Sequence, residues 1–182
     1  MKNAIINYFD FTKEFFKNFN DMKVLGTPFQ SSRYLVDAVS NEVKGNKVVE
    51  LGAGNGPITK GILAYHPKMQ FPELQLTAFE INPKLLKNLA KTKDSRLTIV
   101  SESAENFLKY VPEPDCIVSG LPLTSMPRNI VDKVLTSSKK GLYIQYKYWP
   151  EKTLLKDYFN NIKSKVVWRN FPPALVYVCK NL

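Results

Sequence analysis

The sequence predicts a doubly wound α/β fold whose seven-stranded sheet is mostly parallel, with an antiparallel last strand. From Asn46 onward, short apolar runs alternate with helix-like segments. Most of these runs are apolar almost throughout, as in parallel strands covered on both faces. The last two runs are joined only by FPP, which is too short for a crossover helix, so they must form a hairpin. Together these features indicate a Rossmann-like sheet.

The individual elements follow from the same alternation. Strands are expected at 47–53, 74–81, 96–102, 115–120, 141–148, 165–170 and 174–180. Helices are expected at 57–66, 83–92, 103–110, 127–138 and 150–162. Pro83 and Pro127 suit first helical turns, because a proline there sacrifices no helical hydrogen bond.

Residues 1–40 form a separate N-terminal unit ahead of the domain at 41–182. Apolar and aromatic residues recur at spacings of three or four within INYFDFTKEFFKNF, which predicts a short amphipathic helix. GTPFQSS then predicts a turn, a serine cap and a second helix. The aromatic face either lies on a membrane or packs on the domain, as a cap over the cofactor site.

Composition limits the class of protein and its location. The chain has 182 residues, of which 44% are hydrophobic and 23% charged, so one globular domain is expected. No apolar run could cross a bilayer and no signal-peptide pattern is seen, which predicts a cytoplasmic location. Cys116 and Cys179 lie in strand-like runs as buried thiols, and His66 suits a helix cap. No metal site is predicted.

The positive charge is unevenly distributed. The net charge is +10, and residues from Val131 onward carry ten Lys and Arg against three Asp and Glu. Such a basic region suits nucleic acid or an anionic membrane surface, and a merely solvated lysine surface explains it equally well.

VVELGAGNGPI is the strongest chemical signal. An apolar strand ends in Gly52-x-Gly54-x-Gly56, and the next strand ends in Glu80, where a carboxylate can accept hydrogen bonds from ribose hydroxyls. A nicotinamide loop would read G-x-G-x-x-G, whereas G-x-G-x-G preceded by Glu50 is the pattern of S-adenosyl-L-methionine (SAM) sites. A dinucleotide site and a purely structural turn are the alternatives.

The predicted cofactor site extends beyond this loop. Ser31 and Ser32 either close over SAM or only cap the second helix, and Ser103 either faces adenine or caps the next helix. The cofactor-binding residues predicted are Ser31, Ser32, Glu50, Gly52, Gly54, Gly56, Glu80, Ile81, Glu102, Ser103, Ala104 and Ser119.

SGLPLTSMP follows the fourth strand, where the sulfonium of SAM would lie. Enzymes that methylate base amino groups carry Asn/Asp/Ser-Pro-Pro-Tyr/Phe there, and the aromatic ring stacks on the flipped base. Here Ser119 and a proline remain, but Leu121 and Leu123 replace the rest. An aliphatic amine on an apolar molecule therefore fits better than a nucleobase, unless the prolines only terminate the strand.

Over nearly its whole length the sequence resembles the bacterial phospholipid N-methyltransferases, which convert phosphatidylethanolamine stepwise towards phosphatidylcholine. The resemblance rests on the aromatic first helix and on GTPFQSS, ELGAGNG, FEINP, SGLPLTSMP, YIQYKY and VWRNFPPALVY. It implies a class I SAM-dependent methyltransferase that acts on a lipid in an anionic membrane surface, bound peripherally to the inner face. Ala53 and Asn55 depart from the proline and threonine familiar in that family. Ornithine lipids and other amine-bearing lipids remain open as substrates.

The substrate side of the site is predicted from the same motifs. Tyr146 and Tyr148 can relay a proton or hold the methylated cation by cation–π contact, and strand-end packing is the alternative. Catalytic residues are expected at Ser119, Gly120, Leu121, Tyr146 and Tyr148, and substrate contacts at Arg33, Leu121, Leu123, Met126, Tyr146, Tyr148 and Arg169. We expect a monomer with no nucleic-acid partner. An RNA adenine N6-methyltransferase and a non-catalytic membrane-binding protein that keeps the SAM fold are the competing functions.

Overall fold

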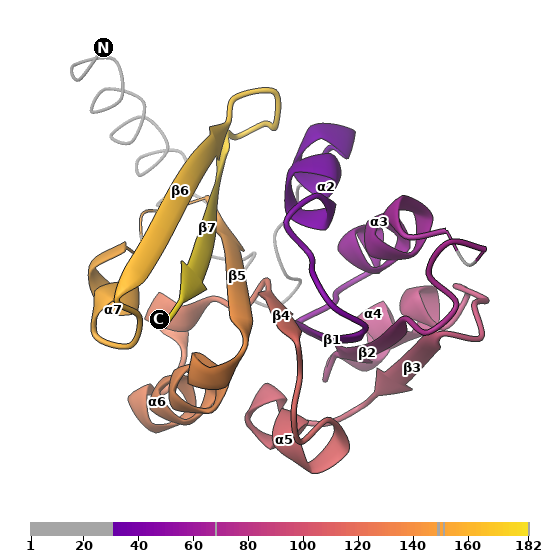
Figure 1. The fold of residues 1–182 in the computed structure, drawn as a ribbon, viewed down its shortest axis with the longest axis horizontal. Helices are drawn as coiled ribbons and strands as arrows, with labels where there is room; N and C mark the ends of the chain where they lie inside the picture. The colour runs from indigo at the N-terminus through magenta and orange to yellow at the C-terminus, as the bar shows by residue number, and fades with distance from the viewer. Residues whose placement is uncertain (1–30, 68, 149, 151, 182) are drawn as a thin grey trace. The chain divides into compact units, whose positions relative to one another are not determined.

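The computed structural model describes residues 31–181 apart from 68, 149 and 151, so the predicted aromatic helix lies outside the described residues (Figure 1). The strands are β1 Lys47–Leu51, β2 Gln75–Phe79, β3 Leu97–Val100, β4 Cys116–Ser119, β5 Leu142–Lys147, β6 Asn161–Val167 and β7 Ala174–Lys180. The helices are α2 Arg33–Ser40, α3 Pro57–Tyr65, α4 Pro83–Leu89, α5 Phe107–Tyr110, α6 Arg128–Ser137 and α7 Lys152–Lys156. Short 3₁₀ turns lie at Ala104–Asn106, Leu123–Ser125 and Ser138–Lys140.

All seven strands form one sheet in the order β3-β2-β1-β4-β5-β7-β6. The pairs from β3 to β5 are parallel, whereas β7 is antiparallel to both β5 and β6. The predicted doubly wound sheet with a reversed last strand is thereby confirmed. Because the chain builds outward from β1 to β3 and then returns to place β4 beside β1, the switch point lies between β1 and β4, where such folds bind ligands.

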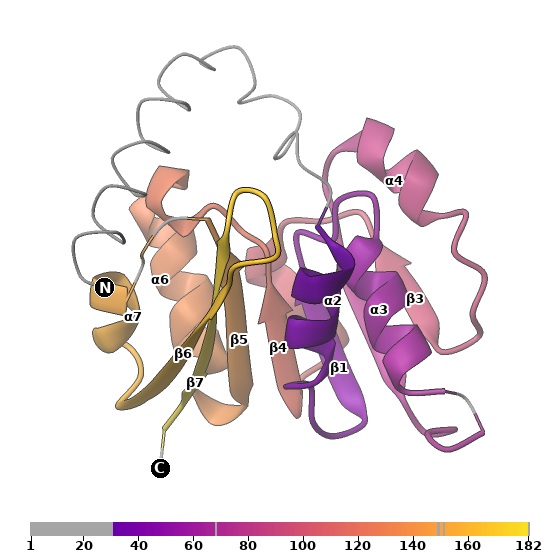
Figure 2. The ribbon, with the colours of Figure 1, turned by 90° about the horizontal axis from the view of Figure 1, so that it is seen from above.

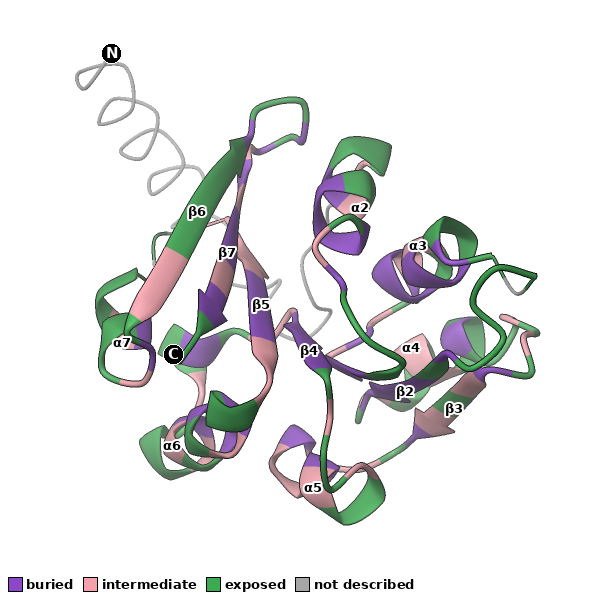
Figure 3. Ribbon diagram, viewed as in Figure 1, coloured by how far each residue is buried: buried purple, intermediate pink, exposed green. Residues whose placement is uncertain are grey.

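Helices cover both faces of the sheet (Figure 2). Alternate residues of a strand point to opposite faces. Accordingly, Val48 of β1 packs in a core cluster with α2 and α3, whereas its neighbour Val49 packs in a second cluster with α5, α6 and α7. The buried residues of β1, β2 and β4 line the middle of the sheet, whereas β6 is exposed over much of its length (Figure 3).

Local sequence signals explain where several helices begin. Ser32 caps α2, because its side chain accepts a hydrogen bond from the Leu35 N–H. Asn82 caps α4 in the same way through the Lys84 N–H, and Pro83 occupies the first helical turn. His66 caps the end of α3, as the sequence predicted, and its side chain is buried. Cys116 and Cys179 are buried free thiols.

The helix expected at 150–162 is wrong over its second half. The helix α7 ends at Lys156, and β6 already begins at Asn161. Polar residues do not alternate with apolar ones along this edge strand, because Lys163, Ser164 and Lys165 are consecutive and all exposed, so its pattern resembles a solvated helix more than a strand. The strand expected at 165–170 likewise ends early, because 168–170 belong to the turn of the hairpin. Among the described residues, no helix is long and apolar enough to cross a membrane.

Candidate functional site

The glycine loop leaves β1 at the switch point and turns sharply. Gly52, Gly54 and Gly56 have φ angles of 75°, 60° and 82°, which only glycine adopts without strain. The loop is fixed to β2, because the N–H groups of Gly52 and Ala53 donate to the Phe79 carbonyl at 2.9 and 3.0 Å. A Cβ built on Gly54 would meet no atom of the described residues within 4 Å. Space for a ligand is therefore open above the middle of the loop.

Glu80 holds the loop from the end of β2. One carboxylate oxygen accepts from the Gly54 N–H and the other from the Asn82 N–H, both at 2.8 Å. Each carboxylate oxygen has two lone pairs, so each keeps one for a further donor. Beside it, Ile81 is 68% exposed at the rim. This geometry fits the predicted role of Glu80 in binding two ribose hydroxyls.

Glu50 lies fully buried below the loop, between Ala78 of β2 and Val118 of β4. One carboxylate oxygen accepts a hydrogen bond from the Thr59 hydroxyl at 2.5 Å, and the other has no hydrogen-bond partner within the part of the chain that the structure describes. Burial raises the pKa of Glu50 to about 8, although the hydrogen bonds from Thr59 oppose the shift. An unpartnered carboxylate oxygen at this position suits a cationic ligand such as the ammonium of SAM.

The segment after β3 contains three predicted cofactor-binding residues, Glu102, Ser103 and Ala104. Glu102 accepts hydrogen bonds from the Tyr110 hydroxyl and, at 3.4 Å, from the Asn106 side chain. Ser103 precedes the 3₁₀ turn without making a side-chain cap, and Ala104 is buried. The Ser103 side chain therefore makes no capping hydrogen bond to this turn, which was the alternative to its role in cofactor binding.

The loop after β4 lies directly against the glycine loop. A Cβ on Gly52 would come within 3.1 Å of the Leu121 side chain. Ser119 is fully buried, and its hydroxyl accepts from the Leu121 N–H at 3.3 Å. Leu121 and Met126 are half-buried, whereas Leu123 lies in the core. Of the three apolar residues predicted to contact the substrate, Leu121 is thus the one that lies against the glycine loop.

Gln145 organises this loop and was not predicted from the sequence. Its buried side-chain amide donates to the Leu121 carbonyl at 3.1 Å, and its carbonyl oxygen accepts from the Tyr143 hydroxyl at 2.6 Å. The Leu123 N–H also donates to the Leu121 carbonyl, at 2.9 Å. The Leu121 carbonyl thus accepts two hydrogen bonds within the protein, and these stabilise the conformation of the loop.

Tyr146 reaches over the same loop from β5. A Cβ on Gly120 would lie 2.3 Å from its hydroxyl oxygen and 3.2 Å from the Gly52 carbonyl. The absence of a side chain at Gly120 therefore makes room for the tyrosine at the switch point. Burial is the main cause that raises the pKa of Tyr146 well above its ordinary value, and the nearby Glu50 adds to it. Tyr148 packs half-buried against the α2–α3 core cluster.

Ser32, Arg33 and Arg169 meet at the start of α2. The Ser32 N–H donates to the side chain of Asn170, which is 1% exposed, at 2.9 Å. The guanidinium carbons of Arg33 and Arg169 lie 5.4 and 4.9 Å from the centre of the Tyr34 ring. Asn170 is a second residue that the sequence did not single out, although it lies in VWRNFPPALVY, one of the stretches that carry the resemblance.

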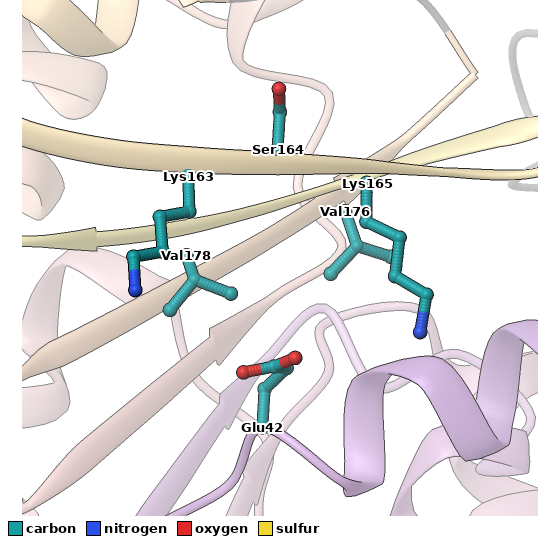
Figure 4. Close-up of a pocket in the computed structure, with 6 residues that line it drawn as sticks. All are labelled: Glu42, Lys163, Ser164, Lys165, Val176 and Val178. Atoms are coloured by element: carbon teal, nitrogen blue, oxygen red, sulfur yellow. The ribbon is translucent and has the colours of Figure 1, made fainter.

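A pocket of about 90 Å³ lies elsewhere, on the sheet face formed by β6 and β7. Figure 4 shows Lys163 and Lys165 on the same side as Val176 and Val178, with Glu42 opposite them. None of its lining residues belongs to the glycine loop or the β4 loop. The chemistry at the switch point is therefore separate from this pocket.

The fold, the glycine loop and Glu80 together are those of the class I SAM-dependent methyltransferase fold, with S-adenosyl-L-methionine as the cofactor. No family profile matches the chain. Among curated proteins, it is similar to the ornithine lipid N-methyltransferase of Singulisphaera acidiphila, with 28% identity over 149 residues that cover 74% of this chain and 76% of the relative.

Solved structures share the fold at low sequence identity. Precorrin-6y C5,15-methyltransferase of Geobacter metallireducens is 16% identical with a TM-score of 0.62, covering 87% of this chain and 98% of that one. The 1,6-didemethyltoxoflavin-N1-methyltransferase of Burkholderia thailandensis, solved with S-adenosylhomocysteine, is 15% identical with a TM-score of 0.62, covering 100% and 90%. These likenesses confirm the predicted architecture.

Proposed function

We propose that the protein transfers a methyl group from SAM to the headgroup amine of a membrane lipid. The observation that carries this proposal is the apolar β4 loop, in which Leu121 lies against Gly52 and Tyr146 against Gly120. The loop offers leucines where base methyltransferases place a stacking aromatic ring. An aliphatic amine needs no such ring, and an apolar site favours its neutral, nucleophilic form.

The proposed reaction is an in-line displacement at the sulfonium methyl group, so the protein mainly aligns the amine and excludes water. Leu121 and Met126 supply the apolar contacts. With its raised pKa, Tyr146 stays protonated at neutral pH, so it acts as a neutral hydrogen-bonding group beside the amine rather than as a base. The amine must then lose its proton before or as it enters the site.

Phosphatidylethanolamine is the first substrate we propose, and an ornithine lipid the second. The first follows from the resemblance of the motifs, and the second from the function of the relative in Singulisphaera acidiphila. Both lipids present an amine at the surface of a membrane. We therefore propose peripheral binding at an anionic membrane, with residues 1–22 and the basic C-terminal third as contributors.

The test follows the methyl group. The full chain is incubated with SAM labelled in the methyl group, together with phosphatidylethanolamine, ornithine lipid or total RNA. We expect label in at least one lipid and none in RNA. The net charge of +10 also suits an RNA enzyme, so label mainly in RNA would replace the proposal by the RNA adenine alternative. SAM binding without transfer to any lipid or to RNA would favour the non-catalytic alternative.

A further inference from the structure

A surface at the tip of the β6–β7 hairpin combines exposed aromatic and basic side chains. We define the hairpin surface by Trp168, Arg169 and Phe171 of the hairpin turn together with Arg33 and Tyr34 of α2. Trp168 is 59% exposed, Phe171 69% and Tyr34 36%. Single exposed apolar side chains are common on protein surfaces, but where such side chains gather they mark interaction sites.

The hairpin surface is held together by a buried polar contact. Asn170, at the centre of the turn, accepts from the Ser32 N–H at 2.9 Å and donates to the Pro172 carbonyl at 2.7 Å. The contact joins the turn to the first residue before α2, 138 positions away in sequence. Arg33 and Arg169 then both lie over the ring of Tyr34. These contacts fix Arg33, Arg169 and Tyr34 relative to one another, and Asn170 joins the turn that carries Trp168 and Phe171 to the start of α2.

The hairpin surface lies on the side of the sheet where the parallel strands end and where the glycine loop follows β1. The strand register pairs Lys147, at the end of β5, with Leu175, which pairs in turn with Val166 near the end of β6. Strands β5 and β6 therefore run in the same direction, and the turn after β6 projects beyond the carboxyl ends of β4 and β5 (Figure 1). A substrate that enters at the switch point approaches from these carboxyl ends.

We propose that the hairpin surface rests on an anionic lipid bilayer. The carboxyl ends of the parallel strands, with the glycine loop and the β4 loop, then face the membrane. Tryptophan and phenylalanine are suited to the boundary between headgroups and acyl chains, and arginine to lipid phosphates. Residues 31–36 and 168–173 contain no acidic residue, so the charge complements an anionic leaflet. This inference rests on the proposed function, because only a lipid substrate requires the carboxyl ends of the strands to face a bilayer.

The experiment measures vesicle binding in the absence of substrate. Full-length protein is sedimented with vesicles of phosphatidylglycerol and phosphatidylcholine, neither of which carries a methylatable amine. The double variant Trp168→Ser, Phe171→Ser should bind these vesicles about tenfold more weakly or worse, since two large apolar side chains no longer enter the interface. SAM affinity should stay at the wild-type value, because both residues lie in the hairpin turn and not in the glycine loop or the β4 loop. The melting temperature is measured alongside to show that the variant is folded.

A matched control removes two exposed apolar side chains near the amino end of β2, on the opposite side of the sheet from the hairpin turn. Met69 and Phe71 precede β2 and are 98% and 38% exposed, so Met69→Ser, Phe71→Ser should leave vesicle binding unchanged. A second readout uses Trp168 itself: after Trp149→Phe it is the remaining tryptophan of two, and its emission should shift to the blue on vesicles.

The outcomes separate this inference from the proposed function. Wild-type vesicle affinity in the folded Trp168→Ser, Phe171→Ser variant, or equal loss in the control, would overturn the membrane role of the hairpin surface. Binding of RNA through these residues, without binding of vesicles, would also overturn it. Lipid methylation in detergent micelles is measured separately. Its absence would refute the proposed function even if vesicle binding followed the expected pattern.

Discussion

The buried carboxylate of Glu50 should make the stability of the ligand-free protein depend on pH. Its pKa is raised from 4.5 to about 8, mainly by burial, so between these values the folded chain holds a proton that the unfolded chain has released. Folding is therefore favoured below pH 4.5, and this contribution is lost as pH rises towards 8. The loss amounts to about 1.4 kcal/mol per pH unit, or about 3 kcal/mol between pH 5 and 7.5.

Glu50→Gln isolates this contribution, because glutamine keeps an acceptor for the Thr59 hydroxyl and does not titrate. Urea unfolding of both proteins across this pH range should show the variant gaining about 3 kcal/mol relative to wild type, while other titrations cancel. Thr59→Val provides the second check: it removes the hydroxyl hydrogen bond, the larger of the two from Thr59 that lower the pKa of Glu50, and leaves the backbone one, so the pH window should extend upward. A wild-type-minus-variant difference that does not change with pH would refute the reasoning.

Three further predictions concern the cofactor, the amine and the membrane. Gly54→Val should abolish SAM binding in calorimetry by filling the open space above the loop, and Glu80→Ala should weaken it by roughly 1.5–3 kcal/mol; wild-type affinity in both folded variants would contradict the site. Leu121→Asp should keep SAM binding but strongly reduce lipid turnover, since a nearby charge stabilises the protonated amine, and unchanged turnover would reduce the β4 loop to a strand terminator. Deletion of residues 1–22 should weaken sedimentation with anionic vesicles, whereas equal binding by a folded truncated chain would exclude that segment as an anchor.

The parts of the site that sequence could predict are those carried by local signals. Gly52, Gly54 and Gly56 mark a turn that other residues resist, and their spacing from Glu80 follows from one strand–helix–strand unit. The FPP connection similarly forces a hairpin, whatever the rest of the chain does. Periodicity failed where exposure removed the contrast between the two faces, as at Lys163 and Lys165 of the edge strand.

The remaining features depend on contacts that are distant in sequence. Gln145 lies 24 residues from the Leu121 carbonyl that it binds, and Asn170 lies 138 residues from Ser32. Nothing in either residue's neighbourhood reveals its partner, because a buried amide can serve many strands equally well. Their roles follow only once the sheet order places β5 beside β4 and the hairpin turn beside α2.

The close approach of Tyr146 to Gly120 also limits the order in which this site can change. Even without its hydroxyl, the ring would remain too close for any side chain at position 120, because the ring carbon that bears the hydroxyl lies only 2.6 Å from a Cβ built there. A shorter residue at 146 must therefore arise first, and only then can 120 accept a side chain. Replacement at 146 is the permissive step and replacement at 120 the dependent one. A lineage whose substrate becomes bulkier or smaller would pass through these two positions in that order.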